Sequence, residues 1–305
     1  MKDKFKAICR MSQKDLKQYT YKQLKETHDN VIQKDGFVYA EGTFPVLLVA
    51  HLDTVHKKLP KKIIFKKGAF SSPNGIGGDD RCGIFMVLDI VKQYNCSVLF
   101  CEDEEIGGVG AEKFLMTKTA DELVGKFNYL IEFDRKGKDD AVFYNCDNPD
   151  FEDFITADKF YTTSLGSFSD ISLLAPYLKA AAVNLSCGYH KAHTTQEYVV
   201  WSEMMNSIEA AKMILARTRP VDKFEYIEGK SNDWFFGLND YYNYNYGYSM
   251  DGMFIISYVD MNGNTKTHEL YADSEVEAVG LFCMEFWEIP YGNILEIYPA
   301  EECYF

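Results

Sequence analysis

The sequence predicts an α/β protein, in which a three-layer sandwich with a mixed, mainly parallel sheet precedes a small α+β domain. Short apolar runs bounded by Gly, Asn and Asp alternate with segments of helical periodicity over residues 31–218, as in strands linked by helices. Several runs are apolar throughout, as in strands buried on both faces. The charge changes near Pro220: residues 1–220 carry 29 basic and 30 acidic side chains, and residues 221–305 carry 3 and 16. We therefore expect two domains, 1–220 and 221–305.

The first domain alternates between the two kinds of element along its whole length. Residues 1–30 have helical spacing, and Ser12 is placed to cap a helix over 15–26. After Val31, short apolar runs predict strands, and a basic run at 61–70 predicts an edge strand. The expected strands are 36–42, 45–53, 61–70, 97–103, 127–134, 141–147 and 180–188, and the later helices are 81–94, 111–124, 148–158 and 202–218.

The second domain is acidic and rich in aromatic residues. An Asn262-Gly263 pair between two apolar runs predicts a hairpin, and Ser274 begins a segment with apolar residues at helical spacing. The aromatic run at 234–248 is interpreted as a packing element between the domains, with a substrate rim or a partner surface as the alternative. The expected elements form a ββαβ unit: strands at 253–259, 266–272 and 293–299, and a helix at 274–288.

Composition and charge exclude several classes of protein. With 305 residues, of which 47% are hydrophobic and 26% charged, the chain can bury a sizeable core without disulfides. Its formal net charge of -14 argues against a nucleic-acid or membrane-surface binder. The eight cysteines are scattered and form no CxxC pair, as is usual for reduced thiols. The N-terminal segment is charged, and no run approaches about 18 apolar residues. We therefore expect a cytoplasmic protein without a membrane span.

Residues that can carry chemistry gather at the ends of the predicted strands of the first domain. In open α/β sheets ligands bind at the carboxyl edge of the strands, so side chains far apart in the sequence converge there. Two histidines and at least three acids at one edge make a site for two divalent metal ions. Five segments carry them: HLDTV at 51–55, GIGGDDRCG at 75–83, CEDEEIGG at 101–108, EFDRKG at 132–137 and HTTQEYV at 193–199.

The physical requirements of a two-metal site assign roles to some of these residues. Two metal ions about 3.5–4 Å apart need a bridging carboxylate, and the Gly-rich turn at 75–83 suits it because small neighbours let the ions approach. A metal-binding imidazole needs a carboxylate to orient it, and Asp53 lies on the same side of its strand as His51. The Glu104–Glu105 pair offers one metal ligand and one general base.

In this order the five segments resemble those of the co-catalytic zinc exopeptidases, the group that includes tripeptide aminopeptidases and the M20, M28 and M42 metallopeptidases. The resemblance covers residues 45–215. It implies two zinc ions, which Mn²⁺ or Co²⁺ can replace on the same ligands, and a cis peptide bond after the bridging residue. The implied roles are His51 and Asp134 as ligands of the first zinc, Glu105 and His193 of the second, Asp79 as the bridging ligand, Asp53 as the carboxylate that orients His51, and Glu104 as the general base.

The sequence offers two histidines, His190 and His193, for the last metal ligand. His190 competes with His193, and the family spacing to the acid and aromatic residue that follow favours His193. His190, Arg135 and Asp170 are candidate substrate-binding residues, with an ordinary surface position as the alternative for His190 and Arg135. Asp170 lies where relatives place a polar loop near the substrate. The remaining histidines, His28, His56 and His268, are expected at the surface.

The resemblance implies a hydrolase of amide bonds, most simply an aminopeptidase that acts on short peptides with Glu104 as the base. Only 58 residues separate Asp134 from His193, which leaves no room for the lid domain that many M20 relatives insert there. A deacylase or amidohydrolase of a small modified amino acid or metabolite is therefore one alternative. A non-catalytic binding protein that acts through residues 221–305 is another. The expected partners are a peptide or small amide substrate and other copies of the chain, with no nucleic acid and no membrane.

Overall fold

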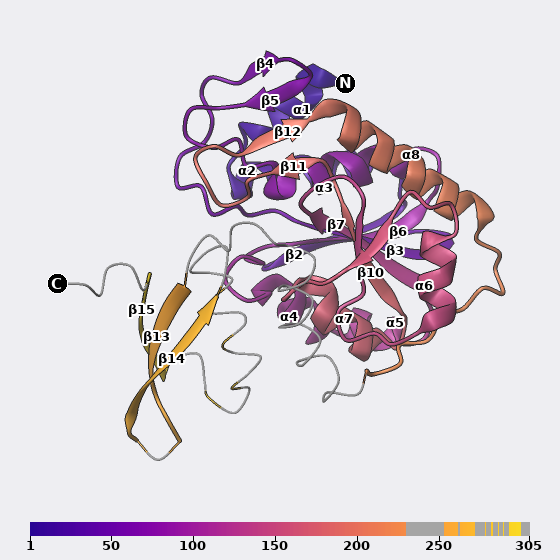
Figure 1. Cartoon of the computed structure of the whole chain (residues 1–305). Helices are drawn as coiled ribbons and strands as arrows, with labels where there is room; N and C mark the ends of the chain where they lie inside the picture. Colours follow the sequence, from indigo (N-terminus) through magenta and orange to yellow (C-terminus); the bar gives the residue numbers. More distant parts are fainter. Residues whose placement is uncertain are drawn as a thin grey trace. The chain divides into compact units, whose positions relative to one another are not determined.

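The chain forms two compact units, Met1–Gly229 and Lys230–Phe305 (Figure 1). The first unit continues past Pro220, since the backbone N–H of Phe224 donates to the carbonyl of Asn128 at 2.9 Å. The computed structural model describes residues 1–229, 253–261, 263–271 and 293–299, together with Ala278, Phe282, Phe286 and Ile289.

The N-terminal unit alternates strands and helices as the sequence predicts. Ser12 caps α2, because its hydroxyl oxygen accepts the backbone N–H of Asp15 at 3.1 Å. The helices are α1 (Lys2–Cys9), α2 (Gln13–Leu24), α3 (Gly78–Ile90), α4 (Val109–Leu115), α5 (Lys118–Leu123), α6 (Pro149–Thr156), α7 (Asp170–Leu178) and α8 (Trp201–Arg217). The strands are β1 (Asn30–Lys34), β2 (Phe37–Glu41), β3 (Phe44–His51), β4 (Ile64–Lys66), β5 (Ala69–Ser71), β6 (Cys96–Cys101), β7 (Tyr129–Arg135), β8 (Asp140–Val142), β9 (Thr162–Ser164), β10 (Ala182–Ser186), β11 (Tyr189–His190) and β12 (Tyr198–Val200).

The central sheet has the strand order β1-β2-β6-β3-β7-β10-β8-β9. Strands β6, β3, β7 and β10 are parallel neighbours, whereas β2 and β8 join this centre antiparallel. The sheet is therefore mixed with a parallel centre, which confirms the predicted class. Parallel neighbours end at the same edge of a sheet, so the loops after β3, β6 and β7 lie together.

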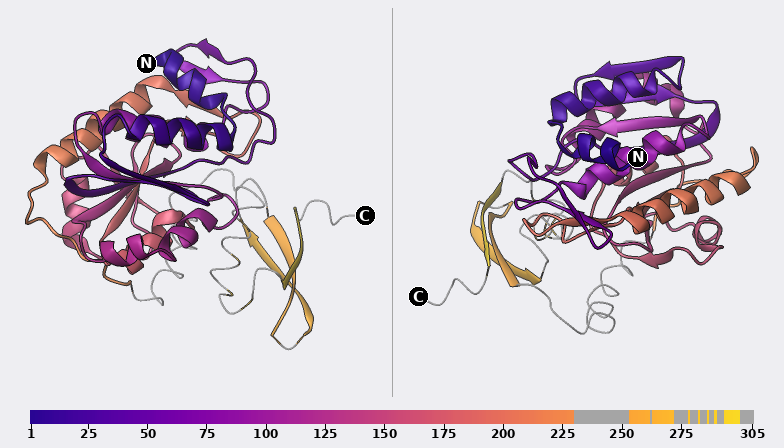
Figure 2. Two further views of the ribbon diagram at one scale, coloured as in Figure 1. Left: turned by 180° about the vertical axis from the view of Figure 1, so that it is seen from behind. Right: turned by 90° about the horizontal axis from the view of Figure 1, so that it is seen from above.

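Helices cover both faces of this sheet (Figures 1 and 2). On β3, Val46, Leu48 and Ala50 belong to one core cluster with buried residues of α1, α2, α3 and α8. Leu47 and Val49 point to the other face and pack with residues of α4, α5 and α7. Both faces of β3 are thus buried, which explains why its sequence is apolar without alternation.

Two predicted elements are each divided in the structure. The strand expected over 61–70 is a hairpin, because left-handed backbone at Lys67 (φ 51°) and Gly68 (φ 84°) turns the chain between β4 and β5. These strands extend a second, antiparallel sheet of order β11-β12-β5-β4. The helix expected over 111–124 is interrupted before Lys118, since Thr117 caps α5 with its hydroxyl oxygen.

The sequence analysis does not predict α7, nor the short strands β1, β9, β11 and β12. At the start of α7, Ser169 and Ser172 form a capping box. Ile171, Leu174 and Leu178 follow at helical spacing and are buried in the core with β3. Both signals are present in the sequence, so α7 was predictable from local patterns alone.

The described part of the C-terminal unit contains an antiparallel sheet of order β14-β13-β15. Alternate residues of β13, Phe254, Ile256 and Tyr258, are buried and pack with Ala278 and Phe282. This confirms the predicted hairpin and last strand. The predicted helix at 274–288, apart from single positions, and the aromatic run at 234–248 lie outside the described residues. The strands are β13 (Met253–Val259), β14 (Thr265–Tyr271) and β15 (Ile294–Pro299).

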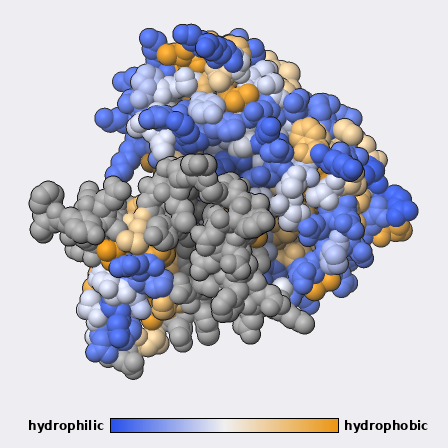
Figure 3. Space-filling model, in the orientation of Figure 1, coloured by the Kyte–Doolittle hydropathy of each residue, from blue (hydrophilic) through white to orange (hydrophobic). Residues whose placement is uncertain are grey.

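Hydrophilic residues cover most of the N-terminal unit on the face drawn in Figure 3, and apolar residues form small separate areas. None of the helices in the described ranges is both long and apolar enough to cross a membrane. Of the histidines expected at the surface, His28 is buried, with its Nε2 2.8 Å from the carbonyl oxygen of Cys96. His268 is partly exposed and packs on Phe286.

Candidate metal centre

Five of the predicted site residues meet at the carboxyl edge of the central sheet. His51 ends β3, Asp134 lies at the end of β7, and Asp79 lies in the first turn of α3. Glu105 follows β6, and His193 lies between β11 and β12. Their ligand atoms form two groups, His51–Asp79–Asp134 and Asp79–Glu105–His193, and within each group all atoms lie within 4.8 Å of one another. Asp79 belongs to both groups.

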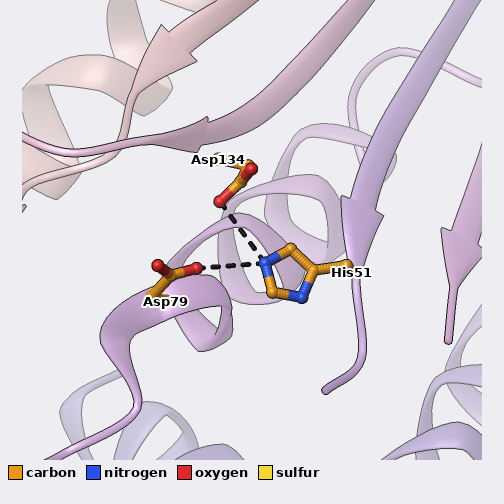
Figure 4. A group of neighbouring side chains, drawn as sticks. All are labelled: His51, Asp79 and Asp134. Carbon is orange, nitrogen blue, oxygen red and sulfur yellow. Dashed lines mark hydrogen bonds and ion pairs between the residues drawn. The ribbon is translucent and has the colours of Figure 1, made fainter. Parts of the chain in front are cut away.

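The two oxygens of Asp79 face different histidines. Asp79 Oδ1 lies 3.0 Å from His51 Nε2, and Asp79 Oδ2 lies 3.1 Å from His193 Nε2. In the first group Asp134 Oδ1 is 3.4 Å from the same His51 nitrogen (Figure 4). In the second, Glu105 Oε2 is 3.2 Å from His193 Nε2. A carboxylate in this position can bind two metal ions at once, one through each oxygen.

Asp79 and Asp80, the adjacent acids of the turn that begins α3, make different contacts. The peptide bond between Asp79 and Asp80 is cis, as the resemblance implies. Asp80 points away from the ligand groups: its carboxylate accepts the backbone N–H groups of His51 at 3.2 Å and Gly83 at 2.8 Å. Asp80 thereby joins the end of β3 to α3, and Asp79 alone is directed at both histidines.

Asp53 orients one histidine and also the loop after β6. Its Oδ1 lies 3.1 Å from Nδ1 of His51. The same carboxylate accepts the backbone N–H groups of Glu104 and Glu105, each at 3.1 Å. Burial works against the charge of Asp53, but the His51 charge and these hydrogen bonds outweigh it and hold its pKa below the usual range. An ionised Asp53 accepts a hydrogen bond from the Nδ1–H of His51, so the Nε2 nitrogen faces the ligand group.

Glu104 lies beside the two groups without belonging to either. Its Oε2 is 4.0 Å from His51 Nε2, and the residue is buried. Burial raises its pKa well above the usual value, and the negative charge of Asp134 raises it further. A carboxyl group with a raised pKa binds a proton more readily than a free carboxylate, which is a property required of a general base.

The electrostatics of the metal-free site fit a divalent cation. Burial and the charge of Asp79 raise the pKa of Asp134 to about 7, and burial together with Asp79 raises that of Glu105. Burial lowers the pKa of His193, but its hydrogen bonds to Asp79 and Glu105 prevail and raise it to about 11. Among the described residues, one oxygen of Glu105, Oε1, is buried without a hydrogen-bond partner. Carboxylate oxygens and two imidazole nitrogens form a set of ligands that can hold divalent metal ions.

The structure brings His193, and not His190, into a ligand group. His190 pairs instead with Glu203, Nε2 to Oε2 at 2.6 Å, and stacks on the ring of Tyr198. His193 has left-handed backbone (φ 62°), which is uncommon for a residue with a side chain. Such positions cluster at ligand sites, where surrounding contacts hold them in place.

The other two candidate substrate residues lie close to the centre but have different surroundings. Arg135 follows Asp134, and its Nε donates to Asp140 at 3.1 Å. Asp170 is completely buried at the start of α7 and does not lie in an exposed loop. Among the described residues neither of its oxygens has a hydrogen-bond partner of ordinary geometry, and burial raises its pKa to about 7.

His56 is largely buried and Arg81 fully buried near the centre, and neither was expected there from the sequence. His56, expected at the surface, lies with its Nε2 2.7 Å from Oε2 of the buried Glu197. The fully buried Arg81 donates to the backbone carbonyls of Leu52 at 2.9 Å and Asp53 at 2.5 Å, just beyond β3. A buried arginine is rare unless it is bonded, so its place directly before the apolar stretch of α3 was the available signal.

No protein-family model matches the sequence, and no curated protein matches it. Solved structures share its fold. The aminopeptidase PepT from Bacillus cereus has a TM-score of 0.57 at 14% identity, over 70% of this chain and 96% of that one. A tripeptidase from Staphylococcus aureus has 0.55 at 12%, over 70% and 97%. PhTET1, solved as a dodecamer in the asymmetric unit, has 0.53 at 14%, over 71% and 98%. The chain therefore has the fold of these aminopeptidases, as the sequence resemblance implies.

Proposed function

We propose that the chain is a metal-dependent aminopeptidase that removes residues from short peptides. The observation that carries the proposal is the carboxylate of Asp79, whose two oxygens lie 3.0 Å and 3.1 Å from the imidazoles of two separate ligand groups. The shared fold with solved aminopeptidases supports a peptide as the substrate.

The residues of the centre fit two divalent ions. His51 and Asp134 would hold the first, Glu105 and His193 the second, and Asp79 both. Zinc is the ion that this mixture of nitrogen and oxygen ligands favours, and Mn²⁺ or Co²⁺ can occupy the same ligands. Bound zinc lowers the pKa of water to about 7 and polarises a carbonyl group, which is the chemistry that amide hydrolysis needs.

Glu104 is the residue that we propose to move the proton. Its carboxylate accepts a proton from the attacking water and returns it to the amine that leaves. The raised pKa of Glu104, caused by burial and by Asp134, favours acceptance of the proton. Asp53 supports the reaction from behind, because it holds the backbone of Glu104 and the ring of His51 in place. His190 and Arg135 remain our candidates for substrate contacts, whereas Asp170 is completely buried and is no longer one of them.

The test measures the metal content and the turnover of the same purified protein. We would measure zinc, manganese and cobalt in the purified protein and then assay unblocked di- and tripeptides beside N-acyl amino acids with each metal. The matched control is Glu104→Gln, which keeps the size of the side chain but removes the base. We expect two metal ions per chain in both proteins, and a loss of turnover of about 10²–10⁴-fold in the variant.

Each result separates the proposed function from its alternatives. Cleavage of N-acyl amino acids alone would replace the aminopeptidase by the deacylase or amidohydrolase. Full turnover in Glu104→Gln would remove Glu104 from the mechanism. Failure of the unmodified chain to bind any of the metals would leave the binding-protein hypothesis, with residues 221–305 as the part to test.

We also propose that the chain self-associates and works in the cytoplasm. One protein of the same fold, PhTET1, was solved as a dodecamer, and light scattering would show whether this chain forms a defined oligomer. The cysteines of the N-terminal unit are all free and buried, as is usual in a reducing compartment.

A further inference from the structure

We infer that Glu197 is a positioning residue that holds the bridging ligand Asp79 against the second ligand group. Glu197 is not itself a candidate ligand, and no catalytic role requires it. The inference rests on the proposed function, because it assumes that the two groups bind metal. Beyond that function, we assign the geometry of the shared ligand Asp79 to its buried contact with Glu197.

Each carboxylate oxygen of Glu197 accepts a backbone N–H of the turn that carries Asp79. Its Oε1 accepts the backbone N–H of Asp79 at 3.0 Å, and its Oε2 accepts the backbone N–H of Gly77 at 2.7 Å. Oε2 also lies 2.7 Å from Nε2 of His56. The side chain of Glu197 is 0% exposed, so water cannot replace these partners. Glu197 thus holds the turn through the backbone of Asp79 and Gly77 and not through the ligand atoms.

Glycines let the turn approach Glu197 and His56 this closely. A Cβ atom at Gly78 would lie 2.6 Å from a methyl carbon of Val199 and 3.2 Å from Oε1 of Glu197. A Cβ at Gly75 would lie 2.1 Å from the ring of His56. Side chains at these two positions would push the turn away from the pair. The Gly-rich sequence before Asp79 therefore serves the contact with Glu197 and His56.

One loop carries both this contact and a ligand. Glu197 lies four residues after His193, and its backbone N–H donates to the carbonyl of Thr194 at 3.1 Å. Any movement of the loop would shift the imidazole of His193 and the backbone of Asp79 together. The 3.1 Å separation between His193 Nε2 and Asp79 Oδ2 is kept in this way. Residues that orient metal ligands typically change metal affinity by about 10–100-fold when replaced.

The variant that tests this role is Glu197→Gln. An amide keeps the volume and one acceptor oxygen, but its NH₂ group faces a donor, so at least one of the N–H groups of the turn loses its partner. We expect both zinc ions to bind about 10–100-fold more weakly in a competition titration against a chelator. His56→Gln, which leaves both backbone contacts of Glu197 in place, should weaken binding less.

The matched control is Glu203→Gln. Glu203 pairs with His190 at 2.6 Å, much as Glu197 pairs with His56, but it contacts no residue of the ligand groups. Its zinc affinity should equal that of the unmodified chain. The melting temperature of each metal-free variant shows whether it is folded, so a general loss of structure is recognised separately from a loss of affinity.

The outcomes distinguish the two proposals. If the unmodified chain binds two zinc ions and folded Glu197→Gln binds them equally well, the positioning role is wrong and the proposed function stands. An equal loss of affinity in Glu203→Gln would also overturn the role, because the effect would not depend on the contact with Asp79. If the unmodified chain binds no zinc, the proposed function fails first, and this role fails with it.

Discussion

Replacement of Asp79 should weaken both metal sites at once, whereas replacement of Asp134 should weaken only one. Asp79 places one oxygen 3.0 Å from His51 Nε2 and the other 3.1 Å from His193 Nε2, so its carboxylate is shared. Asp134 contacts only the first group, 3.4 Å from His51 Nε2. The variants Asp79→Ala and Asp134→Ala therefore compare a ligand that both groups share with a ligand that belongs only to the first group.

The magnitude follows from the number of ligands lost. Each group has three protein ligands, and Asp79→Ala removes one from both. Loss of an outer partner alone typically costs about 10–100-fold in affinity, which is about 1.4–2.7 kcal/mol. Loss of a direct ligand should exceed that, so both dissociation constants should rise by more than about 100-fold. In Asp134→Ala only one should rise by this factor.

Equilibrium dialysis against buffered zinc, followed by elemental analysis, measures the stoichiometry directly. At a free zinc concentration that fills both sites of the unmodified chain, we expect Asp134→Ala to retain one ion per chain and Asp79→Ala to retain fewer than one. Far-UV circular dichroism checks that both variants are folded. Retention of one tightly held ion by Asp79→Ala would refute the argument, because it would show that Asp79 serves one group only.

Two further predictions concern stability. Burial and Asp79 raise the folded-state pKa of Asp134 to about 7, so the folded state keeps a proton that the unfolded chain releases near pH 4. The metal-free protein should therefore lose stability as the pH rises from about 4 to 7. The pKa of His193 is raised to about 11, so stability should continue to fall above pH 6.5. Urea titrations that show constant or rising stability between about pH 4 and 11 would contradict the raised pKa values of Asp134 and His193. Ser12→Ala should lower the free energy of unfolding by about 1 kcal/mol, because it removes the cap on the N–H of Asp15. Ser12→Asn, which can still cap, is the control in the same urea titrations.

Much of the fold was predictable because its signals are local. The apolar sequence of β3 is that of a strand buried on both faces, and the structure places it between two core clusters. The order of strands and helices then implied that the residues at the ends of the parallel strands converge at one edge of the sheet. The errors also had local causes: the Lys67-Gly68 turn divides a basic run into β4 and β5, and the capping box at Ser169 begins a helix that apolar spacing supports.

What the sequence determined by itself was therefore the class of fold and the residues that end the parallel strands, since these depend on periodicity and on residue type. Tertiary structure decided which atoms meet. Asp79 and Asp80 are adjacent and chemically identical, yet one faces both imidazoles and the other binds the backbone of His51. Glu197 reaches Asp79 across 118 positions of sequence. No local pattern encodes such a contact, because it exists only when a distant loop packs against the turn and excludes water from it.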